Sequence, residues 1–111
     1  MVFNILSSLY NTEGPERVGF ITKDNEIIEV PNVCQTPTEG FVVDTQDIIK
    51  YSEVSIATWH THPSASSNLS NEDDVLVKNW PHLLHYIIGK DGVRCFYYDD
   101  KKQATLEKAC E

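Results

Sequence analysis

The sequence predicts one α+β domain spanning residues 1–111, with a central mixed or antiparallel sheet flanked by helices. Its 111 residues match the usual size of a single domain, and 41% of them are apolar, which is enough for one core. Segments with strand and helix patterns follow one another without the regular βαβ alternation of parallel-sheet proteins. The length also excludes large multi-layer enzymes, such as the (β/α)8 barrel of about 250 residues.

The N-terminal half of the chain predicts a hairpin between two helices. Gly14-Pro15 ends the first helical segment, and Asp24-Asn25 supplies the turn of the hairpin. Asp44 or Thr45 is the expected N-cap of the second helix. The expected helices cover residues 3–10 and 45–51, and the expected strands cover residues 16–22, 26–30 and 41–43.

The C-terminal half contains the clearest strand pattern, at residues 53–60. Val54 and Ile56 fall on one face of this strand, and Ala57 and Trp59 fall on the other. Apolar side chains on both faces indicate a buried, central strand. The remaining elements are a serine-rich loop at 63–69, a helix from Ser70 to Trp80-Pro81, and strands at 83–89, 93–98 and 103–107.

The charge balance narrows the range of partners. Nine Lys and Arg residues stand against seventeen Asp and Glu residues, which gives a net charge of −8 without any basic stripe. Nucleic acid is therefore not an expected partner, whereas a hard cation or a neutral or basic peptide suits this charge. No apolar run approaches the roughly 18 residues that a membrane span needs, so no membrane partner is expected either.

The cysteines and the N-terminal residues predict a cytoplasmic location. Cys34, Cys95 and Cys110 are odd in number, lie far apart and form no CxxC pair. This usage argues against a disulfide framework and for a reducing compartment. The first residues also lack the basic start and long apolar run of a secretory signal.

The candidate metal ligands begin at the end of the central strand. His60 and His62 are two residues apart, so the strand period places both imidazoles on the same face. Pro63 ends the strand, so these side chains lie at the end of the strand and not in its middle. Two imidazole nitrogens that leave one face together can converge on a single metal ion.

Two neighbouring acids compete for the position of the third ligand. Asp73 shares a helical stripe with Val77 and faces the core, whereas Asp74 precedes Lys78 by four residues and suits a solvated ion pair. An inward carboxylate needs a cation or hydrogen bonds to offset its burial. Ser70 and Asp73 also fit a purely structural helix cap. Two histidines and Asp73 would leave a fourth tetrahedral position open, as in catalytic zinc sites.

The pattern His60-x-His62-Pro63, followed after six residues by Ser70-x-x-Asp73, resembles the signature of the JAMM (MPN-plus) metalloprotease family. Proteins of this family are zinc peptidases and isopeptidases, many of which cleave next to ubiquitin or ubiquitin-like tails. The resemblance implies the MPN fold, which is a cytidine-deaminase-like α+β arrangement, and one zinc ion per chain. The order of elements is similar to the family over roughly residues 3–100.

The family pattern adds an upstream glutamate, commonly three residues before a glycine. Glu16 has this spacing from Gly19, and strand alternation places it on the face of Val18. Glu13 is the rival, but it precedes the Gly14-Pro15 break and is expected to be exposed. Glu16 is therefore the expected counterpart of the family's glutamate.

The resemblance implies a role for each residue of the pattern. His60, His62 and Asp73 would hold Zn²⁺, which acidifies a water molecule and polarises the scissile carbonyl. Glu16 would act as general base toward that water and then protonate the leaving amine. Ser70 would donate a hydrogen bond to the oxyanion, an interaction that can be worth about 3 kcal/mol.

No second catalytic motif is present in the sequence. HExxH, GxSxG, a Gly-rich phosphate loop and the HxE and PCxxC motifs of zinc deaminases are all missing. His82 and His85, three residues apart after Pro81, are interpreted as surface or hairpin residues. Cys34 has no neighbouring histidine that would suggest a nucleophilic dyad.

The brevity of the chain suggests which members of the family it resembles most. It has no room for the long insertions that bind diubiquitin, and residues 30–44 and Trp80-Pro81 resemble tail-assembly peptidases of tailed phages. The resemblance implies a phage tail protein as substrate, cleaved in the cytoplasm of a prokaryote or a phage-infected host cell. Two alternatives remain: a prokaryotic enzyme that trims ubiquitin-like modifiers, and a non-catalytic MPN scaffold, which usually lacks one or more ligands.

Overall fold

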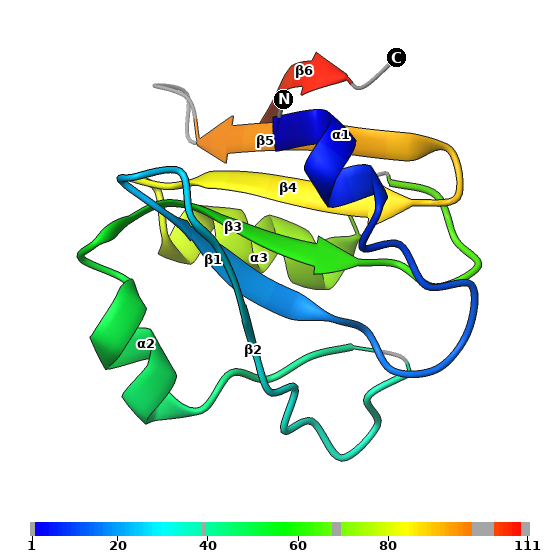
Figure 1. Cartoon of the computed structure of the whole chain (residues 1–111), viewed down its shortest axis with the longest axis horizontal. Helices are drawn as coiled ribbons and strands as arrows, with labels where there is room; N and C mark the ends of the chain where they lie inside the picture. The colour runs from blue at the N-terminus through cyan, green and yellow to red at the C-terminus, as the bar shows by residue number, and fades with distance from the viewer. Residues whose placement is uncertain (1, 39, 68–69, 99–103, 110–111) are drawn as a thin grey trace.

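The fold is built on one sheet whose strand order decides which residues meet. The computed structural model describes residues 2–38, 40–67, 70–98 and 104–109. Six strands lie in the order β2-β1-β3-β4-β5-β6, and every neighbouring pair is antiparallel except β3–β4 (Figure 1). The strands are β1 (Val18–Thr22), β2 (Ile27–Val30), β3 (Ser55–Thr61), β4 (Leu84–Gly89), β5 (Gly92–Tyr98) and β6 (Ala104–Ala109).

Helices cover both faces of this sheet, which confirms the expected α+β class. α1 (Val2–Ser7) lies on one face, and α3 (Asn71–Asn79) lies behind the opposite face (Figure 1). α2 (Thr45–Tyr51) lies near β1, where the ring of its Tyr51 packs on that of Phe20. None of the helices in the described ranges has the length and apolarity that crossing a membrane requires.

The face toward α1 carries the largest core cluster. Trp59 is fully buried at its centre, and the indole Nε1 donates a hydrogen bond to the Ile28 carbonyl at 3.2 Å. This contact requires a glycine at position 19, because a Cβ there would lie 2.6 Å from the Trp59 Nε1 and 1.9 Å from the Ile28 oxygen. The buried members of the cluster are Leu6, Ile21, Ala57, Trp59, Ile88 and Val93.

The face toward α3 carries two smaller clusters. In one of them, Val77 of α3 is buried with Ile87 and Phe96 of the sheet. In the other, Phe20 lies between the two helices, with its ring centroid 5.6 Å from that of Tyr51 and 6.2 Å from that of Trp80. These aromatic contacts attach α2 and the end of α3 to β1.

The second helix has the expected bounds, and the structure decides which of the two expected residues is its N-cap. The Asp44 carboxylate accepts a hydrogen bond from the Gln46 N–H at 2.9 Å, so Asp44 rather than Thr45 is the N-cap. The third helix also begins after its expected cap, Ser70. Capping residues therefore located both helix starts correctly.

The expected strand at 41–43 is wrong. Only Val43 pairs with another segment there, through a single bridge to Asn32. The Asn32 side chain replaces a strand partner, because its Oδ1 accepts the Val42 N–H at 3.1 Å and its Nδ2 donates to the Gly40 carbonyl at 3.0 Å. A side chain that satisfies the backbone in this way removes the need for a ladder.

Other element bounds also differ from the sequence expectation. The first helix ends at Ser7 instead of residue 10, β1 begins at Val18 instead of residue 16, and β6 runs beyond residue 107 to Ala109. β3 is central as expected, but Val54 and Ile56 are 48% and 39% exposed. Burial on both faces of β3 begins only at Ala57.

The interpretation of His85 as a surface residue is wrong, although it does lie in the β4–β5 hairpin. His85 is 1% exposed, with Nε2 at 3.0 Å from the Trp80 carbonyl and Nδ1 at 2.8 Å from the Thr58 hydroxyl. Because a carbonyl only accepts, Nε2 carries the hydrogen and Nδ1 accepts from Thr58. Burial, partly offset by the Trp80 carbonyl, lowers the pKa of His85 to about 4. His82 is exposed, as expected.

We predict that Gly19→Ala destabilises the domain by about 3 kcal/mol, because the new methyl group overlaps backbone and indole atoms that are fixed by the sheet. Chemical denaturation with tryptophan fluorescence measures the free energy of unfolding. Gly40→Ala is the matched control, since a Cβ at residue 40 meets no atom within 4 Å. Equal effects of the two substitutions would contradict the proposed packing of Trp59.

We predict that His85 weakens the metal-free domain in acid. The pKa of His85 in the folded chain is about 4, which lies below its ordinary value. Between these two pKa values, the unfolded chain therefore binds more protons than the folded chain. The free energy of unfolding therefore falls as the pH drops, by about 2 kcal/mol between pH 7 and pH 5 from this residue. Denaturation at both pH values in a chelator should show a smaller fall for His85→Gln than for the unmodified chain. The exposed His82 gives the control, His82→Gln, which should retain the full fall.

Candidate metal centre

The centre forms where β3 ends, on the sheet face covered by α3. His60 and His62 are two residues apart along an extended backbone, so both imidazoles leave this face. His60 is 1% exposed and the His62 side chain is 11% exposed. Their Nε2 atoms lie 3.1 Å apart. The two-residue spacing thus brings two potential ligand nitrogens to one point.

Asp73 reaches the same point from the first turn of α3. The Ser70 hydroxyl accepts the Asp73 N–H, and the Ser70 N–H donates to Asp73 Oδ2, both at 3.1 Å. The same carboxylate lies beside both imidazoles, with Oδ1 2.9 Å from His60 Nε2 and Oδ2 3.0 Å from His62 Nε2. Asp73 is therefore both a helix-capping residue and a potential ligand, and the two sequence interpretations hold together.

Strand register brings Glu16 to the two histidines. Val18 lies opposite His60 in the antiparallel β1–β3 pair, so the residue two positions before Val18 lies beside the residue two positions after His60. The ligand atoms of Glu16, His60 and His62 all lie within 4.8 Å of one another. This group is one that could hold a metal ion.

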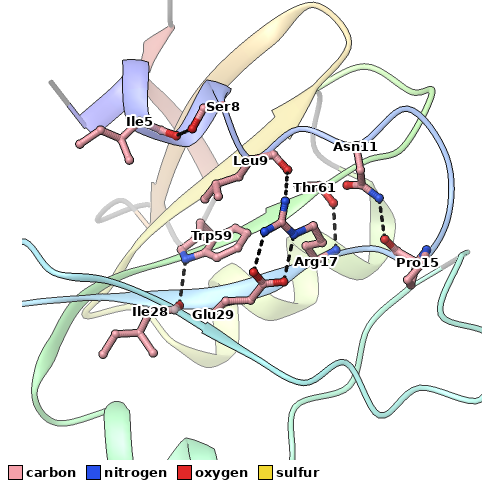
Figure 2. A network of polar contacts seen from close by, with 10 residues as sticks. All are labelled: Ile5, Ser8, Leu9, Asn11, Pro15, Arg17, Ile28, Glu29, Trp59 and Thr61. Atoms are coloured by element: carbon pink, nitrogen blue, oxygen red, sulfur yellow. Dashed lines mark hydrogen bonds and ion pairs between the residues drawn. The ribbon is translucent and has the colours of Figure 1, made fainter.

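Arg17 fixes the backbone next to Glu16 (Figure 2). Its N–H donates to the Thr61 hydroxyl and its carbonyl accepts the Thr61 N–H, each at 2.9 Å. Its guanidinium donates to both Glu29 carboxylate oxygens, at 2.6 and 3.0 Å, and to the Leu9 carbonyl at 2.8 Å. The hydrogen bond to Glu29 raises the pKa of Arg17. Arg17 thus ties the start of β1 to β2, β3 and the segment after α1.

A loop holds the backbone of Glu16 itself. The Glu16 N–H donates to the Pro37 carbonyl at 2.6 Å, and the Glu16 carbonyl accepts from Asn32 Nδ2 at 2.8 Å. Residues 32–37, which follow β2, therefore support the backbone of Glu16. Glu13, the rival in the sequence, is exposed and is absent from the group of residues that could hold a metal.

The hydrogen-bond chemistry of His62 calls for a cation. Its Nδ1 lies 2.8 Å from the Ser66 carbonyl, which only accepts, so Nδ1 carries a hydrogen. The neutral ring then presents a lone pair at Nε2, 3.0 Å from an Asp73 oxygen that also has no hydrogen. Two facing acceptors are stable only with positive charge between them, supplied by a proton on His62 or by a metal ion.

The pKa values of the pair show the same demand for charge. Burial lowers the pKa of His62, but hydrogen bonds to the Asp73 carboxylate and the Ser66 carbonyl outweigh it and raise the pKa overall. Burial likewise opposes ionisation of Asp73, yet hydrogen bonds from His60 and His62 hold the pKa of Asp73 far below its usual range. Without a metal, Asp73 thus favours the charged form of His62, and the two imidazoles favour the ionised form of Asp73.

The distances between the donor atoms suit a small tetrahedral ion. Zinc–nitrogen bonds of about 2.0–2.1 Å at tetrahedral angles place neighbouring ligand atoms about 3.3 Å apart. The three separations among His60 Nε2, His62 Nε2 and the Asp73 oxygens are 2.9, 3.0 and 3.1 Å. Small side-chain shifts would reach the ideal spacing. His60 is held differently from His62. Its buried Nδ1 has no hydrogen-bond partner in the described structure, and its ring centroid lies 4.7 Å from that of Phe41.

The loop after His62 is fastened to the turn between β4 and β5. The Lys90 N–H donates to the Ala65 carbonyl at 2.8 Å, and the Ser67 N–H donates to Asp91 Oδ1 at 2.7 Å. Gly89 allows this close approach, because a Cβ there would lie 2.3 Å from the Ser67 nitrogen and 2.4 Å from the Ser66 carbonyl carbon. The turn thereby sets the position of the carbonyl that orients His62.

A cleft of about 670 Å³ opens beside these side chains. Its walls carry many polar groups, and they come from the loop around residues 34–41, the segment after His62 and the start of α3. Glu16, His62, Ser70 and Asp73 line it together. Ser70 is exposed there, and because its oxygen accepts the Asp73 N–H, its hydroxyl hydrogen remains available to a ligand.

The structure thus gathers Glu16, His60, His62, Ser70 and Asp73 in one place. The Asp74 side chain and Cys110 lie outside the described residues, and Cys34 and Cys95 form no disulfide bond within the described part of the chain. Sequence reasoning missed Phe41, whose ring packs on His60, because nothing in its local pattern links it to a strand 19 residues later. It also missed Gly89, for which the glycine beside the turn was the available signal.

Comparison with known proteins adds no relative to this description. No family model matches the chain, and no protein of curated function matches it either. The geometry of the centre therefore carries the functional argument alone.

We predict that Gly89→Ala weakens binding of Zn²⁺ or Co²⁺ about 10- to 100-fold, because the methyl group displaces the loop whose Ser66 carbonyl orients His62. Isothermal titration with either ion measures the affinity. Nitrogen NMR of the metal-free protein reports the protonation of His62, which a merely structural defect elsewhere would leave unchanged. Gly40→Ala, also at the cleft, is the control; an unaltered affinity in Gly89→Ala would contradict this role of the turn.

Proposed function

We propose that this chain is a zinc-dependent peptidase or isopeptidase of the JAMM (MPN-plus) type. One observation carries the proposal: the Nε2 atoms of His60 and His62 converge on the Asp73 carboxylate at 2.9–3.1 Å, with Glu16 beside them. Two imidazoles, one carboxylate ligand and a second carboxylate nearby make up the donor set of a hydrolytic zinc site. The mixed sheet between α1 and the α2–α3 pair is compatible with the MPN fold.

The residues divide into ligands and groups that act on the substrate. His60, His62 and Asp73 would hold the ion, which when bound acidifies a water molecule and polarises the scissile carbonyl. Glu16 accepts the proton of the attacking water and delivers it to the leaving amine. Ser70 donates its hydroxyl hydrogen to the oxyanion that forms at the carbonyl. Both groups line the cleft beside the ligands, where a substrate carbonyl would enter.

The substrate would be a protein or peptide chain that enters the polar cleft in extended form. The net charge of −8 favours a neutral or basic segment and disfavours nucleic acid. The likeness of residues 30–44 to tail-assembly peptidases favours a phage tail protein, processed in the cytoplasm of a prokaryote or a phage-infected host. A ubiquitin-like tail is the second substrate class, since its extended C-terminus would suit the same cleft.

We predict that Glu16→Gln abolishes hydrolysis while the protein keeps one zinc ion per chain. The amide cannot accept a proton, but it leaves the three ligands in place. Native mass spectrometry measures zinc, and cleavage of a proteome-derived peptide mixture, followed by mass spectrometry, measures activity. Glu13→Gln is the matched control, because Glu13 is exposed and lies outside the metal group. It should keep both zinc and activity.

The other outcomes of this experiment separate the alternatives. A chain that binds no zinc when freshly purified, or that keeps zinc in His62→Ala, contradicts the site. A chain that binds zinc but cleaves neither the peptide mixture nor an isopeptide-linked ubiquitin-like dimer is a non-catalytic MPN scaffold. Cleavage of the dimer alone would assign the ubiquitin-like class, and cleavage of linear peptides alone would favour the processing of a tail protein.

A further inference from the structure

An apolar cavity of about 280 Å³ lies beside the candidate metal centre, on the α3 face of the sheet. Its floor is β1, where Phe20 contributes the ring that contacts α2 and α3. Its walls come from the segment 41–43, from Ile48 of α2, and from Leu76 of α3 and Trp80 at the C-terminal end of α3. Neither the zinc chemistry nor the helix caps described above use this space.

The lining of the cavity suits apolar groups. Thr58 and Trp80 carry the polar side-chain atoms among the described residues that line it. The Thr58 hydroxyl donates its hydrogen to His85 Nδ1 at 2.8 Å, because His85 uses its own hydrogen on the Trp80 carbonyl. With so few polar atoms in the lining, the cavity favours an apolar group over a polar one.

The cavity adjoins the centre directly. Phe41 and Leu76 line both the cavity and the polar cleft, and the Phe41 ring lies 4.7 Å from that of His60. Val42, which also lines the cavity, is 50% exposed, so the space opens to solvent at its rim. Because the two spaces share these walls, a polypeptide bound in the cleft can place a side chain in the cavity.

The size of the cavity fits one large side chain. A cavity of roughly 150 Å³ already takes a benzene-sized group, so this larger, open pocket has room for leucine, methionine or phenylalanine. The cleft beside the centre offers hydrogen-bonding groups for a peptide backbone together with apolar surface. The cavity differs from it because its lining is almost entirely apolar.

We propose that the cavity binds the side chain of a residue that flanks the scissile bond, and that the substrates are polypeptides with leucine, methionine or phenylalanine at that position. This inference rests on the proposed peptidase function. It adds a specificity pocket formed by Phe20, Phe41, Val43, Ile48, Leu76 and Trp80. The acidic surface then selects the neutral or basic chain around this apolar anchor.

Cleavage-site profiling tests the pocket. The zinc-loaded protein is incubated with a proteome-derived peptide mixture, and mass spectrometry reads the residues on both sides of each cleaved bond. Leucine, methionine and phenylalanine should be enriched at one of the two flanking positions. In Ile48→Phe, which narrows the cavity, the ratio of kcat/KM for a leucine peptide to that for the matched alanine peptide should fall at least about tenfold.

Ile49→Phe is the matched control. Ile49 follows Ile48 on the same helix, but it is 71% exposed and does not line the cavity. The ratio should stay as in the unmodified chain, with thermal unfolding showing that both variants are folded. A flat profile at both flanking positions, or a ratio unaffected by Ile48→Phe, overturns the pocket while leaving the peptidase function intact.

A second measurement keeps the pocket testable if neither the peptides nor the isopeptide-linked dimer is cleaved, an outcome that refutes the proposed function instead. N-acetyl-leucine amide is titrated into the zinc-loaded protein, and methyl NMR follows Ile48 and Val43. Saturable shifts at these methyl groups, lost in Ile48→Phe and kept in Ile49→Phe, support the apolar pocket. No saturable shift up to millimolar concentrations of the probe overturns it.

Discussion

The pairing of Val18 with His60 across β1 and β3 is the constraint on which the candidate centre depends. This pairing places Glu16 beside the end of β3. The hydrogen bonds between Arg17 and Thr61 continue the pairing by one residue beyond Val18 and His60. Because side chains alternate along a strand, a slip of one residue would turn Glu16 to the opposite face of the sheet. Gly19 and Trp59 oppose such a slip, since only glycine fits beneath the indole.

Asp73 links the stability of α3 to the chemistry of the centre. Its carboxylate closes the capping box with Ser70 and at the same time lies within 3.0 Å of the Nε2 atoms of both imidazoles. The bond from the Ser70 N–H holds Asp73 Oδ2 in this position. The helix start would thus hold the carboxylate ready for a metal ion.

Local patterns in the sequence were sufficient for the helix starts and for the two histidines of the centre, whereas Glu16 was predicted from the resemblance to the family pattern. Asp44 and Ser70 follow capping rules that depend only on nearby residues, and the spacing of His60 and His62 follows from strand geometry. The failures at segment 41–43 and at His85 depend on distant partners. The Asn32 side chain satisfies the backbone of segment 41–43 in place of a neighbouring strand. The Thr58 hydroxyl and the Trp80 carbonyl are the hydrogen-bond partners of the two ring nitrogens of His85. No local pattern encodes such contacts.

The order of strands in the sheet has a consequence for how the centre comes into being. Its groups come from the start of β1, the end of β3 and the start of α3, and the pairing that joins the first two spans 44 residues of chain. Contacts of such long sequence separation form late, after the loops between them have closed. The unfolded or partly folded chain thus has no assembled site. If the proposed function holds, a newly made chain would bind its metal ion and become able to hydrolyse substrate only once its sheet is complete.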